Sequence, residues 1–191
     1  MLAVVLLLAA LIATSLASAA PSGASGTAPV ASGITAAQVA ATEAADTSIS
    51  LYWRTKAERS GYRQTPDYDE TVRFCRQIEA GSRWVKVESY GTSGQGRDLP
   101  LMIVSRDAAF TPQQAFATGK PIVLIQNGIH SGEIEGKDAT LELLRDLLVR
   151  RTRERLLDHV VLLVLPIFSV DAHERSGRWN RINQNGPTEM G

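Results

Sequence analysis

The fold is decided by the stretch Pro121-Ile122-Val123-Leu124-Ile125-Gln126, which is followed by Asn127-Gly128-Ile129-His130-Ser131-Gly132. The first six residues form a continuous apolar run, which predicts a central strand covered on both faces. The next six predict a loop, and a helix should follow from about Glu133 or Ile134 to Arg151. A second apolar strand is expected from His159 to Leu165. This order of strand, helix and strand predicts a right-handed crossover between parallel strands.

A further helix is expected upstream of this unit. Its start, Thr65-Pro66-Asp67 followed by Glu70, has the pattern of a capping box, and the helix should end at Gly81. Cys75 falls on the apolar stripe of this helix, so we expect it to be a buried core thiol.

Alternating apolar and polar side chains at residues 83–90 and 99–103 predict two neighbouring antiparallel strands. After Ile167 this patterning disappears, and the chain is expected to form a long loop up to Gly191. The sequence therefore predicts an α/β domain with a mostly parallel sheet.

The N-terminal quarter has a different character, because no charged residue occurs before Glu43. Residues 2–13 are an unbroken apolar run and small residues follow, so residues 1–20 are expected to be a secretory signal peptide. The run is short for a bilayer span, which needs about 20 residues, although an uncleaved segment would tether the protein to a membrane. Residues 21–45, rich in Ala, Ser, Gly and Pro, should form a flexible tether, and the folded part should span residues 46–191.

Composition excludes several classes of function. The chain has 20 Lys plus Arg against 20 Asp plus Glu, so it lacks the broad basic field of a nucleic-acid-binding protein. A single Cys excludes an internal disulfide framework and a Cys-rich zinc module.

The candidate chemistry lies in the loop after the first apolar strand, where His130 and Glu133 are three residues apart. Ligands bind at this edge of open α/β sheets, and imidazole nitrogen and carboxylate oxygen are both zinc donors. A catalytic zinc has three protein ligands and an open position, so this loop would supply two of the three. The alternative is a loop in which His130 caps a strand and Glu133 stabilises the first turn of a helix.

Several motifs, in order between about Pro66 and Gly191, resemble the carboxypeptidase A-type zinc metallopeptidases. The stretch from Ile125 to Glu133 is similar to the first zinc motif of that family, His-x-x-Glu after a strand. Ser169-Val170-Asp171-Ala172 lies where the family carries Asn-Pro-Asp-Gly, and Arg181-Ile182-Asn183-Gln184-Asn185-Gly186 is similar to its Arg-x-Asn-x-x-Gly. The connector from Gly91 to Arg97 also resembles the family's Gly-Ser-Gly-Arg connector.

The resemblance implies a three-layer α/β/α fold with a mixed, mostly parallel sheet, of which residues 46–191 are the N-terminal part. His130 and Glu133 would be the first two zinc ligands. Arg181 would be the catalytic arginine that polarises the scissile carbonyl, with Arg178 as its replacement if the alignment shifts. The implied activity is hydrolysis of a peptide bond near a C-terminus by zinc-activated water. The expected signal peptide would place the protein in the periplasm or outside the cell.

This chain also departs from the family pattern. Of Asn-Pro-Asp-Gly only Asp171 is kept, and His159 and His173 lack the context of the third ligand. The third zinc-binding His, the Asn-Arg pair that holds the substrate carboxylate, the lid tyrosine and the catalytic Glu do not occur before Gly191. The resemblance therefore implies that the chain is incomplete at its C-terminus and inactive by itself.

Two alternative functions stay open at this point. One is a zinc acyl-hydrolase of N-acyl amino acids, and the other is a non-catalytic exported module that binds peptide. The expected partners are thus a peptide or an N-acyl amino acid, with no nucleic acid and no stable membrane span after signal cleavage.

Overall fold

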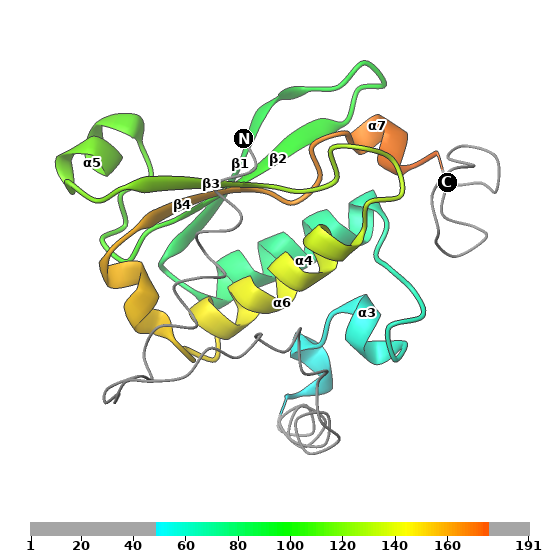
Figure 1. Ribbon diagram of the computed structural model, residues 1–191, viewed down its shortest axis with the longest axis horizontal. Helices are drawn as coiled ribbons and strands as arrows, with labels where there is room; N and C mark the ends of the chain where they lie inside the picture. The colour runs from blue at the N-terminus through cyan, green and yellow to red at the C-terminus, as the bar shows by residue number, and fades with distance from the viewer. Residues whose placement is uncertain (1–48, 176–191) are drawn as a thin grey trace, which may run out of the picture. The chain divides into compact units, whose positions relative to one another are not determined.

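The computed structural model describes residues 49–175 (Figure 1). The predicted signal peptide, the predicted tether and Arg181 lie outside the described residues. The elements in chain order are η1 (Leu51–Trp53), α3 (Lys56–Arg59), α4 (Tyr68–Gly81), β1 (Val85–Thr92), β2 (Asp98–Val104), α5 (Pro112–Ala117), β3 (Ile122–Gln126), α6 (Glu135–Leu148), η2 (Glu154–Asp158), β4 (Val161–Leu165) and α7 (Val170–His173).

The four strands form one mixed sheet in the order β1-β2-β4-β3. β1 pairs with β2, and β2 with β4, in antiparallel orientation, whereas β3 and β4 are parallel. The predicted α/β class, the antiparallel β1–β2 pair and the parallel β3–β4 pair are confirmed. Two of the three pairings among the described residues are nevertheless antiparallel, so the parallel character of this part of the sheet is confined to β3 and β4.

Helices α4 and α6 lie side by side on one face of the sheet (Figure 1). α4 begins with the predicted capping box, in which Asp67 accepts from the backbone N–H of Glu70 and Glu70 accepts from that of Asp67. It ends at Gly81 as expected. Full burial of a large apolar side chain contributes about 1.5–3 kcal/mol, so the packing of this face stabilises the domain. The core is formed by Phe74, Cys75, Ile78, Trp84, Val85, Val87, Met102, Val104, Leu141, Leu144, Leu147, Leu148, Leu157, Leu162 and Val164.

The prediction that β3 is a central strand covered on both faces is wrong for the described part of the fold. β3 is the last strand in the sheet order given above. Because side chains alternate across a strand, Val123 and Ile125 pack against the core, whereas Ile122 and Leu124 point to the other face and are 36% and 48% exposed. The sheet and the pair of helices α4 and α6 thus form two layers, and the third layer stays a prediction.

Two other boundaries differ from the sequence prediction. α6 ends at Leu148, three residues before Arg151, whose φ of +57° is incompatible with a continuing right-handed helix. Within the predicted loop after Ile167 the short helix α7 forms, with a single turn that is too brief to leave an apolar periodicity in the sequence.

Residues 51–67 cover the outer side of α6 through buried polar contacts. Arg145 of α6 donates to both carboxylate oxygens of Glu58 of α3, at 2.6 and 2.5 Å, and both side chains are only 3% exposed. The ammonium of Lys137 is fully buried and donates to Thr65 Oγ1 and to the carbonyl of Pro66, both at 2.6 Å. None of the helices within residues 49–175 has the length and apolar character needed to cross a membrane.

Candidate active site

The candidate metal-binding loop connects β3 to α6 and is fixed to the segment that follows β4. The backbone N–H of Phe168 donates to the carbonyl of Asn127 at 2.8 Å, and that of Ser169 donates to the carbonyl of Gly128 at 3.0 Å. Gly128 has a φ of +58°, and a Cβ added to it would lie 3.5 Å from the side chain of Ile167. The loop therefore needs glycine at this position for its backbone conformation.

Asn127 also ties the loop to the first turns of α6. Its Nδ2 donates to Thr140 Oγ1 at 3.1 Å. A Cβ added to Gly136 would lie only 2.8 Å from Asn127 Oδ1, so a larger residue at 136 would push these two segments apart. The loop is thus held at its start and against the helix that follows it.

His130 and Glu133 face one another across this loop. His130 Nδ1 lies 2.8 Å from Glu133 Oε1, and the backbone N–H of His130 donates to Glu133 Oε2 at 3.1 Å. The side chains of His130 and Glu133 are 64% and 37% exposed, so solvent reaches both the imidazole and the carboxylate. The two side chains are hydrogen-bonded to one another, and an imidazole nitrogen and a carboxylate oxygen are both atoms that can bind zinc.

A third ligand is not found among residues 49–175, where no group of three His, Cys, Asp or Glu side chains converges to hold a metal. Arg181, the predicted catalytic residue, lies outside the described residues. His159 follows η2 just before β4, at the amino end of that strand. Glu135 occupies the first turn of α6, as the sequence predicts.

Asp171 of α7 joins two of the sequence motifs. It accepts from Ser93 Oγ and Arg97 Nη1, both at 2.8 Å, and from the backbone N–H of Gln95 at 3.0 Å. Desolvation would raise the pKa of Asp171, but the hydrogen bonds from Ser93, Arg97 and Gln95 outweigh it and lower the pKa. The connector between β1 and β2 is therefore fastened to the segment that leads toward Arg181.

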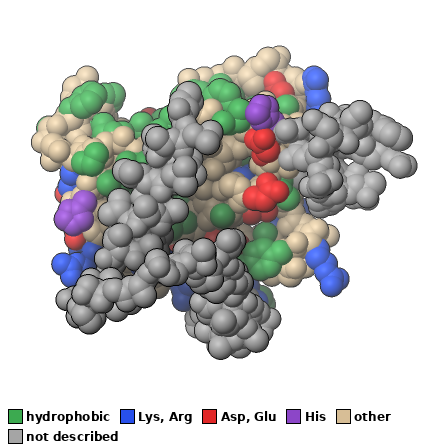
Figure 2. All heavy atoms as spheres, viewed as in Figure 1, with side chains coloured by type: hydrophobic (Ala, Val, Ile, Leu, Met, Phe, Trp, Pro, Cys, Tyr) green, Lys and Arg blue, Asp and Glu red, His purple; other side chains and the backbone are tan. Residues whose placement is uncertain are grey.

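A cleft of about 730 Å³ lies beside the candidate metal loop. It is lined by part of α3, by residues 62–67, by residues of α6 up to Glu142 and by the end of α7; we call it the α6 cleft. Figure 2 shows acidic side chains gathered over the amino-terminal end of α6 on this face. His130 and Glu133 are not among the residues of its wall.

The sequence analysis missed the α6 cleft and left His173, on its wall, unassigned. Glu135, Asp138 and Glu142 occur at spacings of three and four, which places them on one face of the helix. This acidic stripe is the sequence signal from which the cleft could have been inferred. Desolvation, and next the charge of Glu58, raise the pKa of Glu142 to about 7.

Comparison with known proteins supports the family resemblance. The family model for zinc carboxypeptidases matches residues 71–189. Among solved structures, the chain is similar to carboxypeptidase A from Helicoverpa armigera, with 21% identity and a TM-score of 0.50, over 72% of this chain and 33% of that one. No curated protein sequence matches the chain.

Two further solved structures are similar to this chain. Bovine thrombin-activatable fibrinolysis inhibitor has 19% identity and a TM-score of 0.47, over 65% of this chain and 34% of that one. A metallo-carboxypeptidase from Burkholderia cenocepacia has 17% identity and a TM-score of 0.47, over 57% and 28%. The chain therefore spans about a third of the length of the solved structures that it matches.

Proposed function

Because the chain belongs to the zinc carboxypeptidase family, we propose that His130 and Glu133 are zinc ligands and that the whole protein is a metallocarboxypeptidase-like hydrolase. The observation that carries the proposal is the 2.8 Å approach of His130 Nδ1 to Glu133 Oε1 at the carboxyl end of β3. Zinc, when bound, supplies a Lewis acid and lowers the pKa of a bound water to about 7.

The protein's own contribution to this site is orientation. The hydrogen bond from the backbone N–H of His130 holds the Glu133 carboxylate beside the imidazole. Asn127 and Gly128 fix the loop against α6 and the segment after β4, so the two donors are positioned by the fold. Preorganised ligands lose less conformational freedom when an ion binds.

Arg181 is proposed to donate to the carbonyl oxygen of the scissile peptide bond. A guanidinium is always charged and presents fixed N–H donors, which suits it to the negative charge that develops on that oxygen. The segment that leads to it is fastened by Asp171 to the β1–β2 connector.

Zinc affinity of the 191-residue chain tests the ligand assignment, measured by competition with a chromophoric chelator. His130→Ala and Glu133→Ala should each weaken zinc binding by at least about tenfold. The loss of a residue that only hydrogen-bonds to a zinc ligand already lowers metal affinity by about this factor. Glu135→Ala is the matched control and should leave the affinity unchanged. One-to-one zinc binding that survives both ligand substitutions would overturn the assignment.

The substrate class is tested on the whole protein with three related compounds: an N-acylated dipeptide, its C-terminal amide and an N-acyl amino acid. We expect zinc-dependent cleavage of the dipeptide alone. Cleavage of the amide would exclude recognition of a C-terminal carboxylate, and preferred cleavage of the N-acyl amino acid would identify an acyl-hydrolase. Arg181→Lys should lower kcat by about 100-fold, the scale of losing an oxyanion donor.

Export is proposed on the apolar run at residues 2–13 and the small residues that follow it. The protein would then act in the periplasm or outside the cell. Mass spectrometry of protein recovered from these fractions should give a mature chain that starts near Pro21, whereas an intact Met1 in a membrane fraction would indicate a retained tether.

A further inference from the structure

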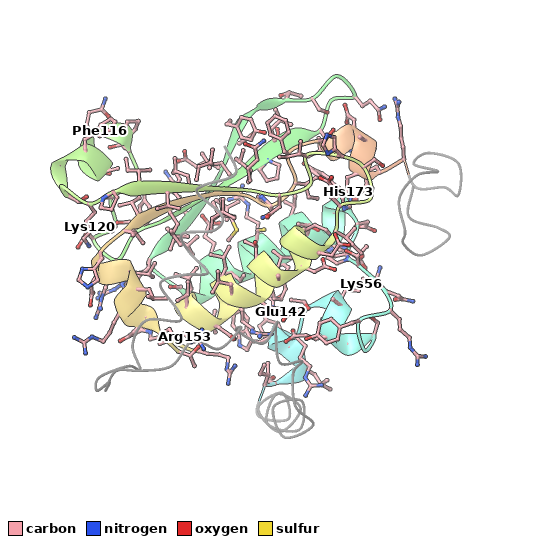
Figure 3. The ribbon with its side chains drawn as sticks, viewed as in Figure 1. Lys56, Phe116, Lys120, Glu142, Arg153 and His173 are labelled. Carbon is pink, nitrogen blue, oxygen red and sulfur yellow. The ribbon has the colours of Figure 1, made fainter. Side chains whose placement is uncertain are left out.

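The carboxyl end of α7 is attached to the start of α4 by polar contacts. Glu174 Oε1 accepts from the backbone N–H of Tyr68, the first residue of α4, at 2.9 Å. The same oxygen lies 2.8 Å from Nδ1 of His173, the last residue of α7. Figure 3 shows His173 on α7, beside the ends of α4 and α6. One carboxylate oxygen therefore joins segments that are 106 positions apart in the sequence.

This arrangement fits the neutral form of the His173 ring. An ionised carboxylate has only acceptors, so Nδ1 carries a hydrogen and donates it to Glu174. Nε2 is then the nitrogen that takes up a proton in acid. The side chain of His173 is 8% exposed, and its Nε2 is buried without a hydrogen-bond partner among residues 49–175. Protonation would therefore place a charged N–H where no acceptor in the described part of the chain can receive it, which is unfavourable.

The charges around His173 act in both directions. α6 contributes the fully buried ammonium of Lys137, which opposes protonation of the ring, and the carboxylate of Asp138, which favours it. Glu174 also favours the charged ring, and Asp67, in the segment before α4, stabilises the charge of Lys137. Burial, and next the charge of Lys137, outweigh the acids and lower the pKa of His173 from its usual value of 6.5. The folded protein therefore favours the neutral ring.

A His173 ring that moved out into water would be free of both the burial and the charge of Lys137. Such a ring is protonated at about pH 6.5, whereas the buried ring binds its proton only at lower pH. Between these two values the detached form holds a proton that the attached form lacks, so acid shifts the equilibrium toward detachment. We propose that protonation of His173 detaches the end of α7, residues 172–175, from the start of α4, so that the attachment of this segment depends on pH.

The detachment is local, because the start of α7 is held by other groups. Asp171 accepts from Ser93 Oγ and Arg97 Nη1 on the β1–β2 connector, and neither contact involves His173. The chain continues from residues 172–175 toward Arg181, so acid would loosen the segment that leads to the proposed catalytic arginine. The inference goes beyond the proposed function and needs neither zinc nor cleavage activity.

Amide hydrogen exchange of Tyr68 in the 191-residue chain tests the proposal, because Glu174 holds this N–H only in the attached form. The protection factor of Tyr68, which corrects for the intrinsic pH dependence of exchange, should fall severalfold between pH 7.5 and 5.5. The limit is about tenfold, set by one proton taken up one unit below pH 6.5. Leu144, in the core of α6, should remain the better protected amide at both pH values, as local opening requires. A protection factor of Tyr68 that does not fall would overturn the proposal.

A pair of histidine variants identifies the group that titrates. His173→Asn provides an amide N–H for Glu174 but does not titrate in this range, so the fall in Tyr68 protection should disappear. His159→Asn, at an exposed position just before β4, is the matched control and should keep the fall. The same fall in His173→Asn as in the parent chain would overturn the proposal.

A second measurement needs no variant that alters α7. Titration of the parent chain, followed by the NMR signals of its histidine rings, should give a pKa below 6.5 for His173. The spectrum of His159→Asn assigns one of the other two histidine rings, and that of His130→Asn assigns the second. A pKa of 6.5 or higher for His173 would show that protonation does not favour detachment, and would overturn the proposal even if His173→Asn fails to fold.

Discussion

Arg97 and Asp171 form an ion pair with a 2.8 Å contact, across 74 positions of sequence, between the β1–β2 connector and the helix that follows β4. Both residues lie in motifs that the sequence analysis identified separately. Although its neighbours depart from Asn-Pro-Asp-Gly, Asp171 has a structural role of its own, because its carboxylate accepts three hydrogen bonds that no neutral small side chain could accept in the same way.

Replacement of Asp171 by Ala should loosen the connector without unfolding the domain. The backbone N–H of Gln95 loses its acceptor, so its amide hydrogen exchange should become at least about tenfold faster, the change expected for loss of one charge-assisted hydrogen bond. Asp98→Asn, at the start of β2, is a control that keeps this acceptor. Unchanged protection of Gln95 in the Asp171 variant would contradict the proposed fastening.

Local chemistry made much of the fold predictable. The capping box of α4 acts over three residues, and the alternation in β1 and β2 is a property of each strand by itself. The apolar run of β3 and the loop with His130 and Glu133 are equally local, and the three-residue spacing brought these two side chains together as expected. The existence and type of these elements could therefore be inferred without a structure.

The remaining features depend on contacts between distant residues. Lys137 and Arg145 carry charges that a sequence pattern assigns to the surface, yet both are buried, because Thr65 and Glu58 reach them from 72 and 87 positions away. The α6 cleft arises from the same long-range packing. The exposure of β3 was likewise missed, since an apolar run shows what a strand can bury but not which layer covers it.

Replacing only one partner of the Glu58–Arg145 ion pair should strongly destabilise the domain. Arg145→Met leaves the Glu58 carboxylate buried without its partner, and we expect a loss of about 3–5 kcal/mol in the free energy of unfolding. Urea denaturation monitored by circular dichroism measures the free energy of unfolding of the variant and of the parent protein.

A double-mutant cycle distinguishes charge from packing in this pair. Glu58→Gln combined with Arg145→Met removes both charges, so the double variant should be less destabilised than the sum of the single variants, by about 1 kcal/mol or more. Strict additivity would show that Arg145 stabilises the fold through its packing alone.

Cys75 should be inert in the native protein. It is fully buried, and burial raises the pKa of its thiol to about 12, so the reactive thiolate is scarce at pH 8. A chromogenic disulfide reagent should label this single cysteine only at the rate at which the domain opens, and should label one thiol per chain at once in guanidinium chloride. Rapid labelling of the folded protein would contradict the packing of α4.

Glu142 should make the stability of the domain depend on pH. Desolvation, and next the charge of Glu58, raise its pKa from 4.5 to about 7, so between these values the folded state holds a proton that the unfolded state has lost. The stability contributed by this group therefore falls as pH rises from 4.5 to 7, and is constant above.

Glu142→Gln removes this penalty. Allowing for the partial exposure of the side chain, the variant should be about 1 kcal/mol more stable than the parent at pH 8, and the difference should vanish at pH 4. Thermal melts at the two pH values measure this difference, and Glu88→Gln, at a half-buried position on β1, should show no such pH-dependent gain. A Glu142→Gln variant that is less stable than the parent at pH 8 would show that the carboxylate already has a compensating partner in the folded protein.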